Sequence, residues 1–189
     1  MKHQFAIPII VLLLSMALAV DAADTNPEDA ATPLGYTLGS ATFKEIKNDL
    51  EKKTEVRDAG TNRYSQGPML EANGDRMGIR DLETALFIFE QDRRLAAVVL
   101  TFRKVDMGRN FDRIYGHLAS KYALVSKRVP FVGDKAAHFE TGSAIIDLEA
   151  PHLGFAITVT YKTRELDKRY RSQLDQNRKQ EQRDSRKQF

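Results

Sequence analysis

The clearest pattern along the chain is an apolar spacing that occurs twice. Hydrophobic residues stand at positions i, i+3 and i+7 in Phe43–Leu50 and again in Phe111–Leu118. Because these positions fall on one face of a helix, each segment predicts a short amphipathic helix. Ser40 or Thr42 is positioned to cap the first helix, and Asn110 the second. Helices this short depend on packing, so we expect each one to lie against another element.

That other element is predicted to be an antiparallel sheet. Six runs rich in β-branched, aromatic and other apolar residues predict strands: 84–90, 95–103, 123–128, 136–141, 143–149 and 154–161. The first two runs flank a short polar turn and the last two flank a turn that contains Pro, which favours two hairpins. The segment 58–81 holds five Gly and Pro residues and predicts short strands between long turns.

The order of the predicted elements is the same in the two halves of the chain. A helix followed by strands occurs over residues 33–104 and again over residues 105–162, which indicates a degenerate internal repeat. The predicted fold class is therefore α+β. We expect two helix-plus-antiparallel-strand repeats to form a two-layer, helix-on-sheet domain over residues 33–162.

The N-terminus has the three-part layout of a secretory signal peptide over residues 1–23. Lys2 supplies a basic start, an apolar run follows, and the small residues of Ala17–Ala19 fit a cleavage site. A retained membrane anchor is the alternative, because the apolar run is nearly long enough to span a bilayer. Residues 24–32 are expected to be a flexible linker. The sequence therefore predicts an exported protein, periplasmic or secreted, and leaves the cleavage site open.

The composition narrows the classes of function. The 189 residues include no Cys, which excludes a disulfide scaffold, a thiolate zinc site and a cysteine nucleophile. An exported protein without disulfides has to be stabilised by its hydrophobic core. The apolar content of 42% is sufficient to form such a core.

The positive charge is concentrated at the C-terminus. Residues 24–162 carry 19 Lys and Arg against 20 Asp and Glu, whereas residues 163–189 carry nine against five. The segment 163–189 is predicted to be a polar, basic helix or tail, with one apolar stripe of Leu166, Tyr170 and Leu174 at its start. It is either a solvated end or a contact for an anionic surface. The candidate contacts are five basic residues: Arg178, Lys179, Arg183, Arg186 and Lys187. Interleaved acidic residues argue against nucleic-acid binding.

One stretch resembles a known architecture. In Leu34–Ile46 a Gly-containing strand end leads through Ser or Thr into a short helix. This resembles the β-lactamase-inhibitor-protein-like architecture, which small outer-membrane-assembly lipoproteins also use. The likeness covers the layout of residues 33–162 and, in sequence, only the helix openings. It implies a binding module rather than an enzyme and transfers no functional residue. The chain departs from the lipoproteins because it has no Cys to carry lipid.

Catalytic chemistry has little support in the sequence. The chain contains neither a G-x-S-x-G nor an H-E-x-x-H motif. Its histidines after the signal segment, His117, His138 and His152, form no recognised ligand pair. Asp147 and Glu149 share one strand face, so an envelope hydrolase that uses these carboxylates or the histidines is the alternative hypothesis. We expect no metal and no cofactor.

Two loop regions are better candidates for recognition, because apolar side chains on turns either fold back onto the core or meet a partner. The binding residues expected there are Tyr64, Met69, Leu70, Phe131 and Lys135. The leading hypothesis is an exported, non-enzymatic binding module of the bacterial cell envelope. Its partner is expected to be a protein or another envelope component, and its oligomeric state is left open.

Overall fold

The computed structural model describes residues 30–105 and 109–187, and it confirms the predicted α+β class. The expected signal peptide, 1–23, and residues 24–29 of the expected linker, 24–32, lie outside the described residues. The described residues form three α-helices and one eight-stranded sheet. In chain order the elements are α1 Phe43–Leu50, β1 Val56–Thr61, β2 Gln66–Asn73, β3 Leu82–Glu90, β4 Leu95–Arg103, α2 Arg109–Ala119, β5 Ala123–Arg128, β6 Lys135–Glu140, β7 Ala144–Ala150, β8 Ala156–Thr163 and α3 Arg164–Lys187.

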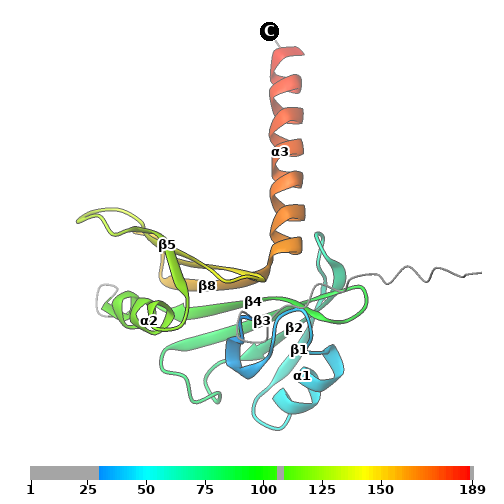
Figure 1. Cartoon of the computed structure of the whole chain (residues 1–189), viewed down its shortest axis with the longest axis vertical. Coiled ribbons are helices and arrows are strands. Elements are labelled where there is room, and N and C mark those ends of the chain that lie inside the picture. The colour runs from blue at the N-terminus through cyan, green and yellow to red at the C-terminus, as the bar shows by residue number, and fades with distance from the viewer. Residues whose placement is uncertain (1–29, 106–108, 188–189) are drawn as a thin grey trace, which may run out of the picture.

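The sheet is antiparallel throughout, with the strand order β1-β2-β3-β4-β8-β7-β6-β5. The two predicted hairpins are β3–β4 and β7–β8, and they meet at the centre of the sheet, where β4 pairs with β8. Figure 1 shows this central pair, with β1 and β5 at the two edges. The Gly-rich segment 58–81 does contain strands, because β1 and β2 lie partly or wholly within it.

The main hydrophobic core lies between the sheet and the helices α1 and α2. Ile46 of α1 and Phe111 of α2 are fully buried in one cluster with alternating residues of the strands, such as Phe87 and Phe139. Figure 1 places α1 and α2 on the same side of the sheet. Both short helices therefore bury their apolar residues in the same cluster as the strands.

The two predicted helix caps have different outcomes. Thr42 accepts a hydrogen bond from the backbone N–H of Glu45, whose carboxylate accepts one from the backbone of Thr42, which forms a capping box. The prediction for Asn110 is wrong. Its side chain donates to the carbonyl of Arg103 and accepts from the N–H of Val105, so it holds the preceding loop instead of the helix start.

The third helix begins on the opposite face of the sheet. It follows β8 without a break and rises away from the sheet, as Figure 1 shows. Leu166 in its first turn is buried against Ile88 and Ala97, which belong to the face that α1 and α2 do not cover. After its first turns the helix is exposed and polar. Among the described residues there is no helix with the length and apolar content needed to cross a membrane.

Candidate functional site

The most distinctive surface is the sheet face opposite α1 and α2, which we call the open face. Because side chains alternate along a strand, the residues between the core positions point to this face. On β3 and β4 they are Leu86, Ile88, Ala97 and Val99, and they form a second apolar cluster with Leu166. This cluster is separate from the main core, so it is an apolar floor beside the base of α3.

A groove of about 300 Å³ lies over this floor. Tyr64, from the β1–β2 turn, and Tyr170, from the second turn of α3, both line it. The two rings meet edge to face with their centroids 5.0 Å apart. Asn62 shapes the turn by accepting hydrogen bonds from the backbone N–H groups of Tyr64 and Ser65. The groove thus joins residues about 100 positions apart in the chain.

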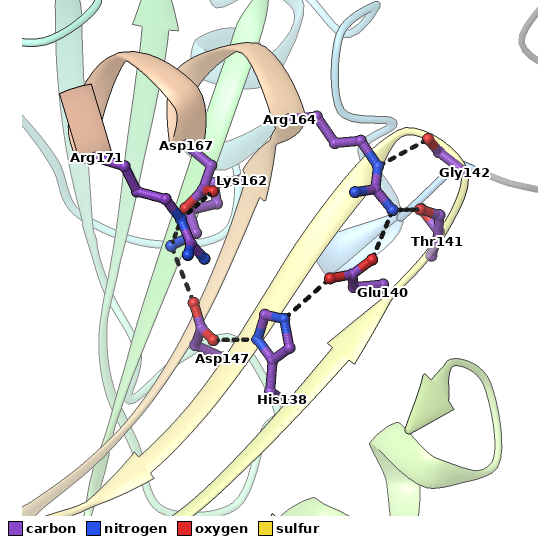
Figure 2. Close-up of polar contacts among 9 residues, drawn as sticks. All are labelled: His138, Glu140, Thr141, Gly142, Asp147, Lys162, Arg164, Asp167 and Arg171. Carbon is purple, nitrogen blue, oxygen red and sulfur yellow. Dashed lines mark hydrogen bonds and ion pairs between the residues drawn. The ribbon is translucent and has the colours of Figure 1, made fainter. Parts of the chain in front are cut away.

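Charged side chains border the groove on β7 and β8. The ammonium of Lys162 lies 3.0 Å from Oδ2 of Asp147 and 2.8 Å from Oδ1 of Asp167. The guanidinium of Arg171 donates to Oδ2 of Asp167 at 2.6 Å. Figure 2 shows that these contacts connect two strands to the first turns of α3. A further ion pair joins Arg169 of α3 to Glu90 of β3.

His138 extends this network to β6. Its Nδ1 lies 2.6 Å from Oδ1 of Asp147 and its Nε2 lies 3.1 Å from Oε1 of Glu140 (Figure 2). Arg164 donates to Oε2 of Glu140 at 2.9 Å and also to the carbonyls of the β6–β7 turn. The network therefore runs without interruption from Arg164 through His138 to Arg171.

Burial and ion pairing act against each other at the centre of the network. Burial by itself would lower the pKa of Lys162, but its hydrogen bonds to Asp167 and Asp147 outweigh burial and raise that pKa. Burial would raise the pKa of Asp167, and its contacts with Lys162 and Arg171 lower it instead. The hydrogen bonds from Arg164 and His138 lower the pKa of Glu140. All three groups are thus held in their charged forms at neutral pH.

The contacts of His138 are not those of a nucleophilic Ser–His pair. Ser126 is the cross-strand partner of His138. Both ring nitrogens of His138 face carboxylates, so neither is directed at a hydroxyl to take up its proton. The geometry instead suits a set of ion pairs that fixes β6, β7, β8 and α3 together. Among the described residues no group of three or more His, Asp or Glu is arranged to hold a metal ion.

The structure places the predicted binding residues at four locations. Tyr64 and Met69 lie at the open face, where both pack against the second apolar cluster. Leu70 points the opposite way and is buried in the main core. Phe131 is fully exposed in the β5–β6 loop. Lys135 lies at the start of β6 with its ammonium 5.6 Å from the centre of the Phe111 ring.

The remaining candidates are also dispersed. His138 and Asp147 are in contact, Glu149 is exposed two residues further along β7, and His117 and His152 are exposed elsewhere. The basic candidates of the C-terminal segment, Arg178, Lys179, Arg183 and Arg186, are exposed on the projecting part of α3. The side chain of Lys187 lies outside the described residues.

Sequence reasoning missed Lys162, Leu166 and Tyr170 as groove residues. The alternation of Thr158, Thr160 and Lys162 with apolar neighbours was a signal that β8 has one polar face. No local pattern indicates that this face meets Tyr64, because the contact depends on the order of strands in the sheet.

A second hollow on the open face is larger, about 550 Å³, and lies over β1 to β4. Its lining is mostly charged, and four of its six charged side chains are already paired: Arg57 with Glu71 at 2.5 Å, and Arg103 with Glu83 at 3.1 Å. A ligand would have to break these pairs to gain contacts there. We therefore regard the apolar groove as the stronger candidate.

Comparisons of the chain with protein-family models, with curated proteins and with solved structures give no significant match.

Proposed function

We propose that this chain is an exported, non-enzymatic binding module of the bacterial cell envelope, and that the groove on the open face receives its partner. The observation that supports the proposal is an aromatic and aliphatic groove on a sheet face that is otherwise polar. Two of its lining residues, Tyr64 and Tyr170, are only partly covered in the free protein. Tyrosine is enriched among the residues that dominate binding energy at protein interfaces.

The partner chemistry follows from the lining. Ile88, Ala97 and Val99 give the groove an apolar floor that suits one aromatic or aliphatic side chain. Glu149 borders the groove and, among the described residues, has no ion-pair partner. A protein segment that carries an apolar anchor with Lys or Arg nearby would satisfy both features.

We also propose that the domain is a duplication with helices α1 and α2 layered on one sheet. The order of helix and four strands in each half supports this proposal, as does the strand order, in which β1 to β4 and β5 to β8 run inward to a central β4–β8 pair. Export through a signal peptide at residues 1–23 and a periplasmic or secreted location are proposed from the sequence pattern alone.

A quantitative pull-down from envelope extract tests the binding proposal. The wild-type chain is compared with Tyr64→Ala and Val99→Arg, the second of which places a charge on the apolar floor. We expect each change to lower recovery of the same partner about tenfold or more, because both act at the centre of the contact.

Two matched variants serve as controls. Tyr64→Phe keeps the ring and should retain most of the binding, whereas Lys44→Ala alters an exposed residue of α1, which packs on the other side of the sheet, and should retain all of it. Recovery that is the same for all variants, or no partner at all, would contradict the proposal.

A further inference from the structure

A separate surface stands out at the end of the sheet where the β5–β6 and β7–β8 loops lie. The described residues expose five large aliphatic or aromatic side chains on these two loops: Val129, Phe131, Val132, Leu153 and Phe155. Phe131 is 105% exposed and Phe155 is 91% exposed, so neither ring is covered by the rest of the protein. Such exposure of several large apolar groups at one place marks an interaction surface.

One hydrogen bond joins the two loops, and Lys104 ties the β7–β8 loop to the segment after β4. Asp134 accepts a hydrogen bond at 2.7 Å from the N–H of His152, which joins the β5–β6 loop to the β7–β8 loop. Lys104 donates to the carbonyls of Pro151 and His152 at 2.7 and 3.2 Å, and its backbone N–H donates to the carbonyl of Phe155. The apolar side chains are thus carried by a fixed pair of loop tips.

Cationic residues lie behind these tips. Lys127 and Arg128 end β5, Lys135 begins β6, and Lys104 lies beneath the β7–β8 loop. The ammonium of Lys127 lies 3.5 Å from the centre of the Tyr115 ring, which holds it beside α2. The carboxylate of Asp134, in the same loop, accepts the hydrogen bond from the backbone N–H of His152. The apolar side chains therefore lie at the loop tips, and the cationic side chains lie behind them, closer to the body of the protein.

We propose that the two loop tips insert into the interface of an anionic lipid bilayer. The apolar side chains protrude from loops and do not line a hollow. They are therefore better suited to insertion into an apolar medium than to binding a partner of complementary shape. The cationic residues behind them are at the depth of the lipid headgroups when the tips reach the acyl chains. This inference does not depend on the groove or on its partner.

The absence of Trp from the chain gives a direct test. Phe131→Trp places a single indole at the tip, and Val125→Trp places one on the exposed strand β5 away from the tip as a matched control. Vesicles of phosphatidylcholine mixed with phosphatidylglycerol should shift the emission of the first variant to the blue and allow quenching by brominated acyl chains. The control emission should change little. The probe reports on the loop itself, whichever other segment of the chain contacts the vesicle.

Vesicle sedimentation gives the second measurement. The double variant Phe131→Ser, Phe155→Ser should reduce the partition coefficient on anionic vesicles by about tenfold or more, because two large apolar groups are lost from the contact. Val125→Ser should leave it unchanged. Both rings are exposed, so the double variant is expected to keep the wild-type circular dichroism spectrum and melting temperature.

Three outcomes would overturn the inference. The first is an indole at position 131 whose emission does not respond to anionic vesicles. The second is adsorption that the loop variants do not change but that is lost when Arg178, Lys179, Arg183 and Arg186 are all replaced by Gln, which would assign adsorption to α3. The third is a photo-crosslinker at position 131 that attaches to a protein and not to lipid in intact envelopes.

Discussion

At the scale of single residues, the close packing of β2 against β3 depends on glycine at positions 67 and 74, and most tightly at Gly67. Gly67 is the second residue of β2, and a Cβ atom added there would lie 2.1 Å from the carbonyl oxygen of Phe89. No real contact is that short, so the backbone of β2 or β3 would have to move. Gly116, in the middle of α2, has open space around the position of a Cβ atom.

The two glycines give opposite predictions for the same substitution. Gly67→Ala should lower the free energy of unfolding by about 2 kcal/mol or more, because overpacking displaces the backbone. Gly116→Ala should raise it by about 0.5–1 kcal/mol, because Ala loses less conformational freedom in a helix. Urea denaturation followed by circular dichroism measures both. Equal effects of the two changes would contradict the close approach of β2 and β3.

Lys162 is the residue on which the polar network depends. It is largely buried between Asp147 and Asp167, so its removal leaves two carboxylates without their shared cation. Lys162→Met should therefore lower the free energy of unfolding by about 1–3 kcal/mol. Adding Asp167→Asn to this variant should recover part of the loss. A single variant as stable as the wild type would show that the ion pairs do not hold α3.

At the scale of elements, the sequence pattern predicts a helix only for the first turns of α3. The stripe of Leu166, Tyr170 and Leu174 predicts a helix, and the structure extends it to Lys187. Beyond the first turns the helix is polar on all sides, so its attachment rests on Leu166, on the edge contact of Tyr170 and on the ion pairs. Polar sequences of this kind carry no apolar period by which a helix could be recognised.

The attachment of α3 should depend on pH in a defined direction. The pKa values of Asp167 and Glu140 are lowered in the folded protein, so their contribution to stability is complete above the pKa values of the unfolded chain, about 4. This contribution is lost as the pH falls through the lower folded values. The pKa of Lys162 is raised, so its contribution is lost only as the pH rises through that value, above about 10.

We therefore expect the melting temperature to be nearly constant between about pH 5 and pH 9 and to fall below about pH 4. Asp167→Asn should reduce the slope on the acid side, because one of the groups that takes up a proton is removed. Circular dichroism melts at several pH values provide the measurement. An acid slope that is identical in the wild type and in Asp167→Asn would contradict the role given to this carboxylate.

At the scale of the whole molecule, the sequence predicts which helices and strands form better than it predicts which strands pair with each other. The two short helices and six of the strands follow from local period and β-branched runs, because both patterns are set by which face is buried. The pairing of β4 with β8 has no local signal, and it decides which polar residues meet. Tyr64 and Met69 could be selected as apolar residues on turns, whereas Lys162 and Tyr170 become part of the site only through that pairing.

The central claim is that the open face, and not the face covered by α1 and α2, is the binding surface. The most direct measurement is site-specific photo-crosslinking in intact envelopes from Val99, on the floor of the groove, and from Asn48, on an exposed part of α1. Our account predicts a discrete protein adduct from position 99 that disappears in Tyr64→Ala, and no adduct from position 48. An adduct from position 48 alone, or an adduct from position 99 that persists in Tyr64→Ala, would contradict it.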